Sequence, residues 1–212
     1  MKNSKKLKIV KNTQEGNFKQ ILNKVPNLSE CETLDIFARE GDWQSNALVS
    51  KVKSIEAWDI EPKFMEGLKK NLPDAKIHCR DSIEFINTTD YNKFDLLVID
   101  NGLNCYGEDG KYCEHFDLIH SIGNVVKDKC FIIFNVVLMP FNYENYPDWN
   151  KRRNDFYKMQ DTSKLSKTFI ENFYRKLFSL IGFETVNYHT ICREYHNDID
   201  YLYYVGIELE KK

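Results

Sequence analysis

The sequence has no apolar stretch long enough to span a membrane, and its basic start, MKNSKKLKIVK, is followed by no apolar core of signal-peptide length. It also has no excess of either charge. With 30 basic and 32 acidic residues, bulk charge favours neither nucleic acid nor a membrane surface. These absences predict a soluble, unprocessed protein that has no nucleic-acid or membrane partner.

Paired metal-binding cysteines are also missing. No two of the six cysteines form a C-x-x-C pair, and several lie in apolar, strand-like contexts where buried free thiols are common. A zinc cluster built from the cysteines and histidines between positions 105 and 120 is therefore disfavoured. The scattered thiols indicate a reducing, cytoplasmic compartment. The six are Cys31, Cys79, Cys105, Cys113, Cys130 and Cys192.

A length of 212 residues fits one α/β domain, residues 1–212, that can bury a full central sheet. Residues 1–32 are expected to form a helical cover, with a helix over the approach to the first strand. Residues 139–166 are expected to cover the substrate. Hydrophobic periodicity predicts strands at 33–37, 54–59, 76–79, 94–100, 130–137, 183–191 and 201–209, with helices that include 17–25, 62–71, 112–126 and 169–180.

The organising stretch runs from Thr33 to Pro62 and reads strand, tight turn, short helix, strand and acid. A strand that stops at a glycine-bearing turn, followed roughly 20 residues later by a carboxylate, outlines a mononucleotide-binding βαβ unit. In such a unit the turn lets the backbone approach a ligand, and the carboxylate accepts the ribose hydroxyls. Asp59 is the predicted ribose acceptor.

The turn, Asp-Ile-Phe-Ala-Arg-Glu-Gly, resembles the first motif of the class I S-adenosylmethionine-dependent methyltransferases. The usual motif is an acid followed by three glycines at alternate positions; Asp35 and Gly41 match, and Phe37 and Arg39 replace the other two glycines. Some members write this loop D-x-F-A-G-x-G, which accounts for Phe37 and leaves Arg39 as the departure. The alternative is a plain strand-to-helix turn that holds no ligand. The resemblance implies S-adenosylmethionine as the cofactor, with contacts from Asp35, Phe37, Ala38, Gly41, Asp59 and Ile60.

A second signal follows the predicted third strand. Asp81, with Glu84 three residues later, has the spacing of a helix cap. In the methyltransferase family an acid at this place accepts the adenine amino group, so the resemblance adds Asp81 and Ser82 to the cofactor site. One carboxylate can serve both purposes.

The strand FDLLVID is apolar almost throughout, as expected of a central strand, and ends in Asp100. Ligands of open α/β sheets lie beyond the carboxyl ends of the strands, so Asp100 is the predicted catalytic residue near the transferring methyl group. Asn101 and Tyr106 are predicted to face the substrate. The sequence Asp-Asn-Gly-Leu replaces the [ND]-P-P-[YFW] motif of base-amino methyltransferases, which counts against base methylation.

Metal binding is weighed separately, because the small-molecule O-methyltransferases that this stretch faintly resembles often hold magnesium. Asn135 matches the amide of their Asp-Asn pair after the fifth strand, but Phe134 replaces the acid. A hard divalent cation takes several oxygen ligands, and Asp100 with Asn135 supplies few. No metal is expected.

The aromatic and charged segment 139–166 is the predicted specificity element. Arg152 and Arg153, beside Trp149, are predicted to grip an anionic group of the substrate, since guanidinium forks bind such groups bidentately. The alternative is a surface helix with a solvated basic turn and an aromatic inner face.

The resemblance, which also covers the terminal Gly-Phe and the last two strands, implies a three-layer α/β sandwich. Its Rossmann-like sheet is mostly parallel and seven-stranded, with an antiparallel last strand. The expected function is methyl transfer to an oxygen or nitrogen of a small metabolite, sugar-like or aromatic. Four alternatives stay open: an aminopropyltransferase-like enzyme, a nicotinamide oxidoreductase, an RNA or protein methyltransferase, and a non-catalytic scaffold motivated by the missing loop glycines.

Overall fold

The computed structural model describes residues 14–42, 44–99, 115–137, 147–162, 165–195 and 199–212. Its strands are β1 (Glu32–Ile36), β2 (Ser54–Asp59), β3 (Lys76–Cys79), β4 (Phe94–Ile99), β5 (Val126–Val137), β6 (Phe183–Tyr195) and β7 (Ile199–Lys211). Its α-helices are α2 (Gln14–Leu22), α3 (Gln44–Leu48), α4 (Met65–Asn71), α5 (Ser82–Thr88), α6 (Pro147–Tyr157) and α7 (Lys167–Leu180). Short 3-10 helices are η1 (Leu28–Glu30), η2 (Pro62–Phe64) and η4 (Ile119–Asn124).

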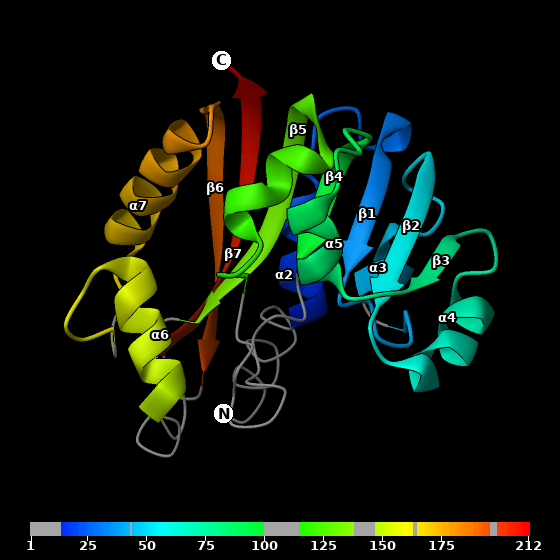
Figure 1. Cartoon of the computed structure of the whole chain (residues 1–212), viewed down its shortest axis with the longest axis horizontal. Helices are drawn as coiled ribbons and strands as arrows, with labels where there is room; N and C mark the ends of the chain where they lie inside the picture. The colour runs from blue at the N-terminus through cyan, green and yellow to red at the C-terminus, as the bar shows by residue number, and fades with distance from the viewer. Residues whose placement is uncertain (1–13, 43, 100–114, 138–146, 163–164, 196–198) are drawn as a thin grey trace, which may run out of the picture.

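The strands form one 7-stranded sheet in the order β3-β2-β1-β4-β5-β7-β6 (Figure 1). The neighbours among β1 to β5 pair in parallel, whereas β7 runs antiparallel to both β5 and β6. The predicted fold class, with a mostly parallel sheet and an antiparallel last strand, is confirmed. The order reverses between β1 and β4, which is where ligands of open α/β sheets bind.

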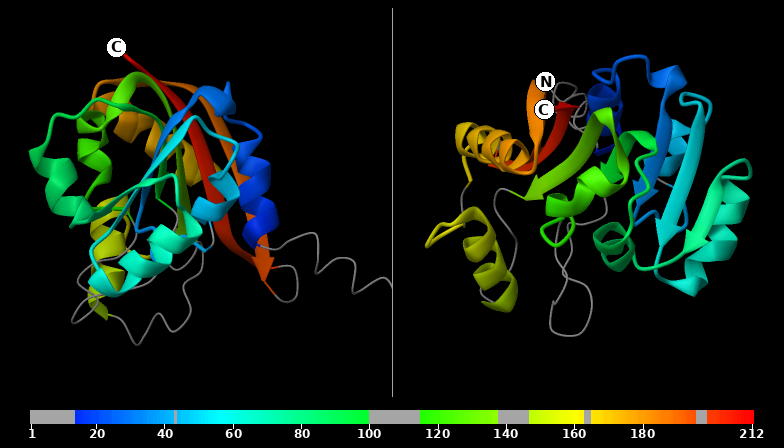
Figure 2. Two further views of the ribbon diagram at one scale, coloured as in Figure 1. Left: turned by 90° about the vertical axis from the view of Figure 1, so that its right-hand side faces the viewer. Right: turned by 45° about the horizontal axis from the view of Figure 1, so that its top comes forward.

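Helices cover both faces of the sheet, which gives three layers (Figures 1 and 2). Helix α2 packs on β6 and β7, where a Cβ atom added to Gly206 would lie 3.0 Å from the side chain of Ile21. Helix α2 also contacts α3, which follows the loop after β1, and its expected cover over the approach to the first strand stays a prediction. On the opposite face, α7 packs along β6 and α5 contacts η4.

The connection between β4 and β5 also differs from expectation. In place of an α-helix at 112–126, its described part holds the 3-10 helix η4, and β5 begins at Val126, earlier than expected. Gly123 lowers helix propensity, and the adjacent β-branched Val125 and Val126 favour an extended chain. The rest of the predicted helix, 112–114, lies outside the described residues.

The core runs through the central strands. Leu96, Leu97 and Val98 of β4 are fully buried, as expected of a strand covered on both faces. Figure 1 shows the carboxyl ends of β1, β2 and β5 at the lower edge of the sheet, where the candidate site is built. None of the helices in the described part of the chain is both long enough and apolar enough to cross a bilayer.

Candidate functional site

The loop after β1 has alternating left-handed residues. Phe37, Arg39 and Gly41 have φ angles of 60°, 52° and 68°. Left-handed backbone costs an L-residue with a side chain roughly 1–2 kcal/mol, so glycine is its usual occupant. Phe37 and Arg39 stand where the family motif has its other two glycines, and the chain keeps the loop shape without them. At Gly41 a Cβ atom would also lie 2.9 Å from Leu72, so both conformation and space require glycine there.

Asp59, the last residue of β2, fixes this loop. The backbone N–H of Arg39 donates to Asp59 Oδ2 (2.8 Å), and that of Glu61 donates to Oδ1 (2.9 Å). Asp59 as a whole residue is only 5% exposed. Because each carboxylate oxygen can accept more than one hydrogen bond, both still have acceptor capacity for further donors. Asp59 is therefore a structural acceptor placed at the carboxyl edge of the sheet, as a ribose acceptor would have to be.

Asp35 lies in β1 and connects the strand to α3. Its carboxyl accepts a hydrogen bond from the hydroxyl of Ser45, and both side chains are buried. Burial raises the pKa of Asp35 to about 7. The Ser45 hydrogen bond opposes this rise, and the nearby Asp59 carboxylate adds to it. Asp35 thus ties β1 to α3, on the far side of the loop. Its direct contact with the cofactor stays a prediction.

Two further predicted cofactor residues follow β2 and β3. Ile60 is 52% exposed, which is unusual for a large apolar side chain and leaves it available for a flat apolar ligand. Asp81 Oδ1 accepts the backbone N–H groups of Ile83 (2.8 Å) and Glu84 (3.1 Å) at the start of α5. The helix-cap interpretation of Asp81 is confirmed, and its adenine role stays a prediction, as does that of the buried Ser82.

The predicted catalytic acid and two predicted substrate residues lie outside the part of the chain that the structure describes. Asp100, Asn101 and Tyr106 lie outside the described residues, so their roles stay predictions. The end of β4 is described as far as Ile99, which pairs with Phe134 of β5. The strands that would present Asp100 to the site are thus in the expected order.

The two adjacent arginines of helix α6 have different surroundings. Arg153 is fully buried: its guanidinium donates to the carbonyl of Val137 (2.7 Å) and lies over the ring of Trp149, itself 4% exposed. Arg152 instead faces outward and pairs with Asp117. Substrate roles for Trp149 and Arg153 stay predictions, and they would require this packing to open. Part of the segment predicted to cover the substrate is therefore core.

The sequence did not predict a buried row of hydrogen-bonded side chains. His115 Nε2 is hydrogen-bonded to the hydroxyl of Tyr174. The Tyr174 hydroxyl is hydrogen-bonded in turn to the hydroxyl of Tyr157 (3.0 Å). Burial lowers the pKa of His115 to about 3, and the Arg153 cation adds to the decrease, so the imidazole stays neutral. No local pattern links these residues, because they come from three separate segments.

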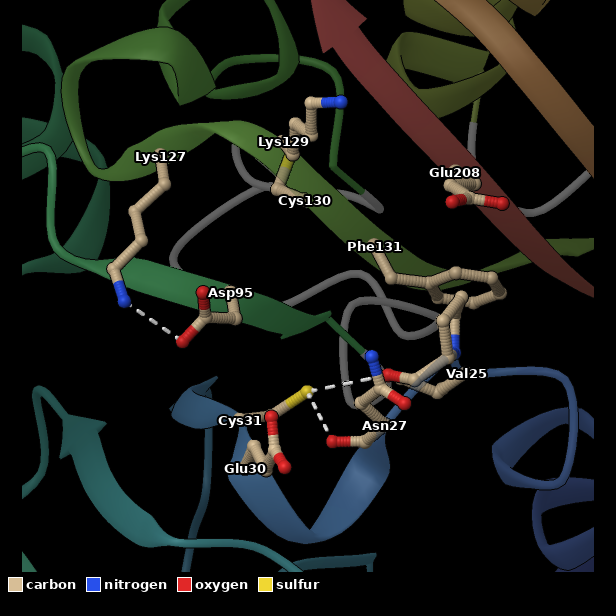
Figure 3. A pocket seen from close by; sticks show the side chains of 11 residues that line it. Val25, Asn27, Glu30, Cys31, Asp95, Lys127, Lys129, Cys130, Phe131 and Glu208 are labelled. Carbon is tan, nitrogen blue, oxygen red and sulfur yellow. Dashed lines mark hydrogen bonds and ion pairs between the residues drawn. The ribbon is translucent and has the colours of Figure 1, made fainter.

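A hollow at the opposite edge of the sheet has different chemistry (Figure 3). It measures about 340 Å³ and lies at the amino ends of β1, β4 and β5. Lys127 pairs there with Asp95 and Glu32, both at 2.9 Å, and burial raises the pKa of the Cys31 thiol to about 11. Paired charges at the amino edge and an unreactive thiol make this hollow a poor catalytic candidate.

Comparisons with known proteins bear on the fold. No family model and no curated protein matches the sequence, but solved structures do. The N-methyltransferase NodS from Bradyrhizobium japonicum, in complex with S-adenosyl-L-homocysteine, has a TM-score of 0.57 at 12% identity, covering 94% of this chain and 90% of its own. The 1,6-didemethyltoxoflavin-N1-methyltransferase of Burkholderia thailandensis has a TM-score of 0.58 at 12% identity, covering 97% and 87%.

A third similar structure is TYW2 of M. jannaschii in complex with AdoMet, with a TM-score of 0.56 at 12% identity, covering 94% of this chain and 78% of its own. The shared architecture extends over nearly the whole chain in all three cases. At such low identity the likeness shows a common fold, that of the S-adenosylmethionine-dependent methyltransferases.

Proposed function

We propose that the protein transfers the methyl group of S-adenosylmethionine to an oxygen or nitrogen of a small metabolite. The observation that carries the proposal is the loop after β1, which keeps left-handed backbone at Phe37 and Arg39 and is fastened to Asp59. Strained backbone of this kind persists only where the surroundings enforce it, and it gathers at ligand sites. Single left-handed residues also occur elsewhere in the chain, at Ser50 and Asn92, but the loop after β1 has three at alternate positions.

The residues present fit the proposed cofactor. Asp59 has acceptor capacity left for two ribose hydroxyls, and the exposed Ile60 follows it directly in the chain. Asp81 uses Oδ1 for its helix cap, which leaves its second carboxylate oxygen for an amino group. When bound, S-adenosylmethionine supplies an electrophilic methyl group on a sulfonium centre.

The protein's own contribution is to bind and orient two reactants and to exclude water, because in-line transfer to a positioned nucleophile gains mostly from proximity. A general base is needed only where the acceptor carries a proton at working pH. Asp100 follows the last residue of β4 and is the proposed group beside the methyl, since the carboxyl end of a central strand faces the ligand.

A small metabolite is the proposed acceptor for two reasons. The near-neutral charge gives no basic track for a phosphate backbone, and Asp-Asn-Gly-Leu replaces the base-amino motif. Two of the structurally similar proteins are named as N-methyltransferases, and one of these was solved with the small molecule 1,6-didemethyltoxoflavin bound. The competing candidate is a scaffold without cofactor, favoured by the side chains that replace the loop glycines.

Calorimetric titration with S-adenosylhomocysteine separates these candidates. Asp59→Asn keeps the shape of the side chain but removes its charge, and it should weaken binding roughly 10- to 100-fold, the value of hydrogen bonds to a charged acceptor. Asp74→Asn, an exposed change of the same kind, should leave affinity unchanged. Absence of binding by the parent protein would favour the scaffold. Equal binding by parent and Asp59→Asn would refute the ribose assignment.

Acceptor class needs a second experiment. Labelled S-adenosylmethionine should transfer its methyl group to a component of a small-molecule extract and not to RNA or protein from the same cells. Label in the RNA fraction, with RNA binding that weakens steeply as salt rises, would contradict the small-metabolite proposal.

A further inference from the structure

A groove lies on the outer side of α7, between that helix, the end of α6 and η4. Its volume is about 580 Å³, larger than the hollow in Figure 3 and within the range of about 300–1,000 Å³ typical of ligand pockets. We call it the α7 groove. Its walls are His120, Phe156, Tyr157, Lys158, Phe169, Asn172, Phe173, Lys176, Leu177 and Leu180.

Helix α7 has two apolar faces. One, with Ile170, Tyr174 and Phe178, is fully buried against the sheet. The other carries Phe169, Phe173, Leu177 and Leu180 at spacings of four, four and three residues, which places them on one stripe about 16 Å long. This stripe forms one wall of the groove, and Leu180 at its end is 77% exposed. A solvated helix face would carry polar side chains at these positions.

Aromatic rings make the groove a preformed surface. Phe173 lies 5.0 Å from the ring of Tyr157 and 5.2 Å from that of Phe156, measured between ring centroids, and it stacks with Phe169 at 6.0 Å. Packed rings of this kind lose little freedom when a ligand covers them. The apolar stripe therefore offers a fixed wall.

The rim of the groove is cationic. Lys158 and Lys176 line it. Among the described residues no carboxylate lines the groove, and neither lysine makes an ion pair. The acids on the neighbouring segments are engaged elsewhere: Asp117 pairs with Arg152, and Glu171 pairs with Arg175 (2.9 Å). The two ammonium groups thus remain available to an anion.

We propose that the α7 groove binds a small amphiphilic anion, with an apolar body along Phe169, Phe173 and Leu180 and a carboxylate or similar head at Lys158 and Lys176. Charge complementarity selects this occupant, because an apolar body alone would leave the two lysines unused. The groove lies at the β6 end of the sheet, away from the loop between β1 and α3 (Figure 1). The proposal is independent of methyl transfer.

Titration with dodecanoate, below its micelle concentration, tests the proposal, with dodecanol as the uncharged control. Dodecanoate should bind saturably at one site and at least tenfold more tightly than dodecanol. The double variant Lys158→Gln, Lys176→Gln should reduce its affinity to that of dodecanol. Lys167→Gln, an exposed lysine of the same helix outside the groove, should change nothing. Leu180→Ala should weaken both ligands.

The proposal would be overturned by no saturable binding, by equal affinity for acid and alcohol, or by equal weakening by Lys167→Gln. Concentration-dependent self-association in analytical ultracentrifugation that Leu180→Ala abolishes would instead make this face an interface between two copies of the chain, and would also overturn it. S-adenosylhomocysteine affinity, measured in parallel, should be the same for every groove variant. The two proposals can therefore fail separately.

Discussion

Replacing Asp35 with asparagine should remove a pH-dependent loss of stability. Asp35 has a pKa of about 7 in the folded protein against an ordinary value of 3.8. As pH rises from about 4 to about 7, the unfolded chain ionises this carboxyl while the folded protein keeps it protonated. Linkage then requires that Asp35 destabilise the folded state increasingly across that window. Asparagine is neutral at every pH and retains an oxygen that can accept the Ser45 hydroxyl.

The expected size follows from the shift. A difference of about 3 pKa units corresponds to about 4 kcal/mol once both states are ionised, and about 2–3 kcal/mol of this falls between pH 5 and pH 8. The free energy of unfolding of Asp35→Asn minus that of the parent protein should therefore rise by about 2–3 kcal/mol over this interval. His115, whose lowered pKa acts in the opposite sense, is present in both proteins and cancels.

Urea denaturation of both proteins at the two pH values measures this difference. Asp74→Asn removes a carboxylate from an exposed position and should show a constant difference from the parent. If Asp35→Asn also differs from the parent by the same amount at pH 5 and pH 8, the carboxyl is ionised in the folded protein. Burial would then not raise the pKa of Asp35 in the folded protein.

Three further pairs of variants test other parts of the structure by thermal or urea unfolding. Arg39→Gly should be about 1 kcal/mol more stable than Arg39→Ala, because only glycine is relaxed at the left-handed φ of 52°; equal stabilities would show that the loop carries no strain. Arg153→Met should cost about 1–3 kcal/mol by leaving a buried carbonyl without its donor, whereas Arg152→Met, at an outward ion pair, should cost under about 1 kcal/mol; the reverse order would contradict the described packing. Ser166→Ala should cost about 1 kcal/mol by removing the cap of α7, and Thr168→Ala nearby should cost less; comparable losses would rule out a special role for the cap.

Much of the framework follows from local sequence. The unbroken apolar run of β4 predicted a central strand, and it is buried in the middle of the sheet. The spacing of Asp81 and Glu84 predicted a helix cap, which the carboxylate of Asp81 makes. The interval between the turn and Asp59 predicted a carboxylate next to that turn, and Asp59 accepts the N–H of Arg39. The cap is local, because Asp81 lies two and three residues from the N–H groups it accepts. The other two predictions succeed because apolar runs and the spacing of a βαβ unit record where strands lie in a sheet.

Other features required the folded chain. The left-handed Arg39 is held by the carboxylate of Asp59 from another strand, and no local propensity records such a contact. The low pKa of His115 depends on burial that residues far along the chain create.

Arg152 and Arg153 show the difference most directly. They are the same residue type at adjacent positions, and both were predicted to bind an anionic group of the substrate. On a helix, consecutive side chains point about 100° apart, so packing α6 against the core buried one guanidinium and left the other outside. The sequence by itself determined the charges and offered a helix only as the alternative interpretation of this segment. The face that α6 turned inward was decided by tertiary packing, because burial is a property of all the segments that meet there.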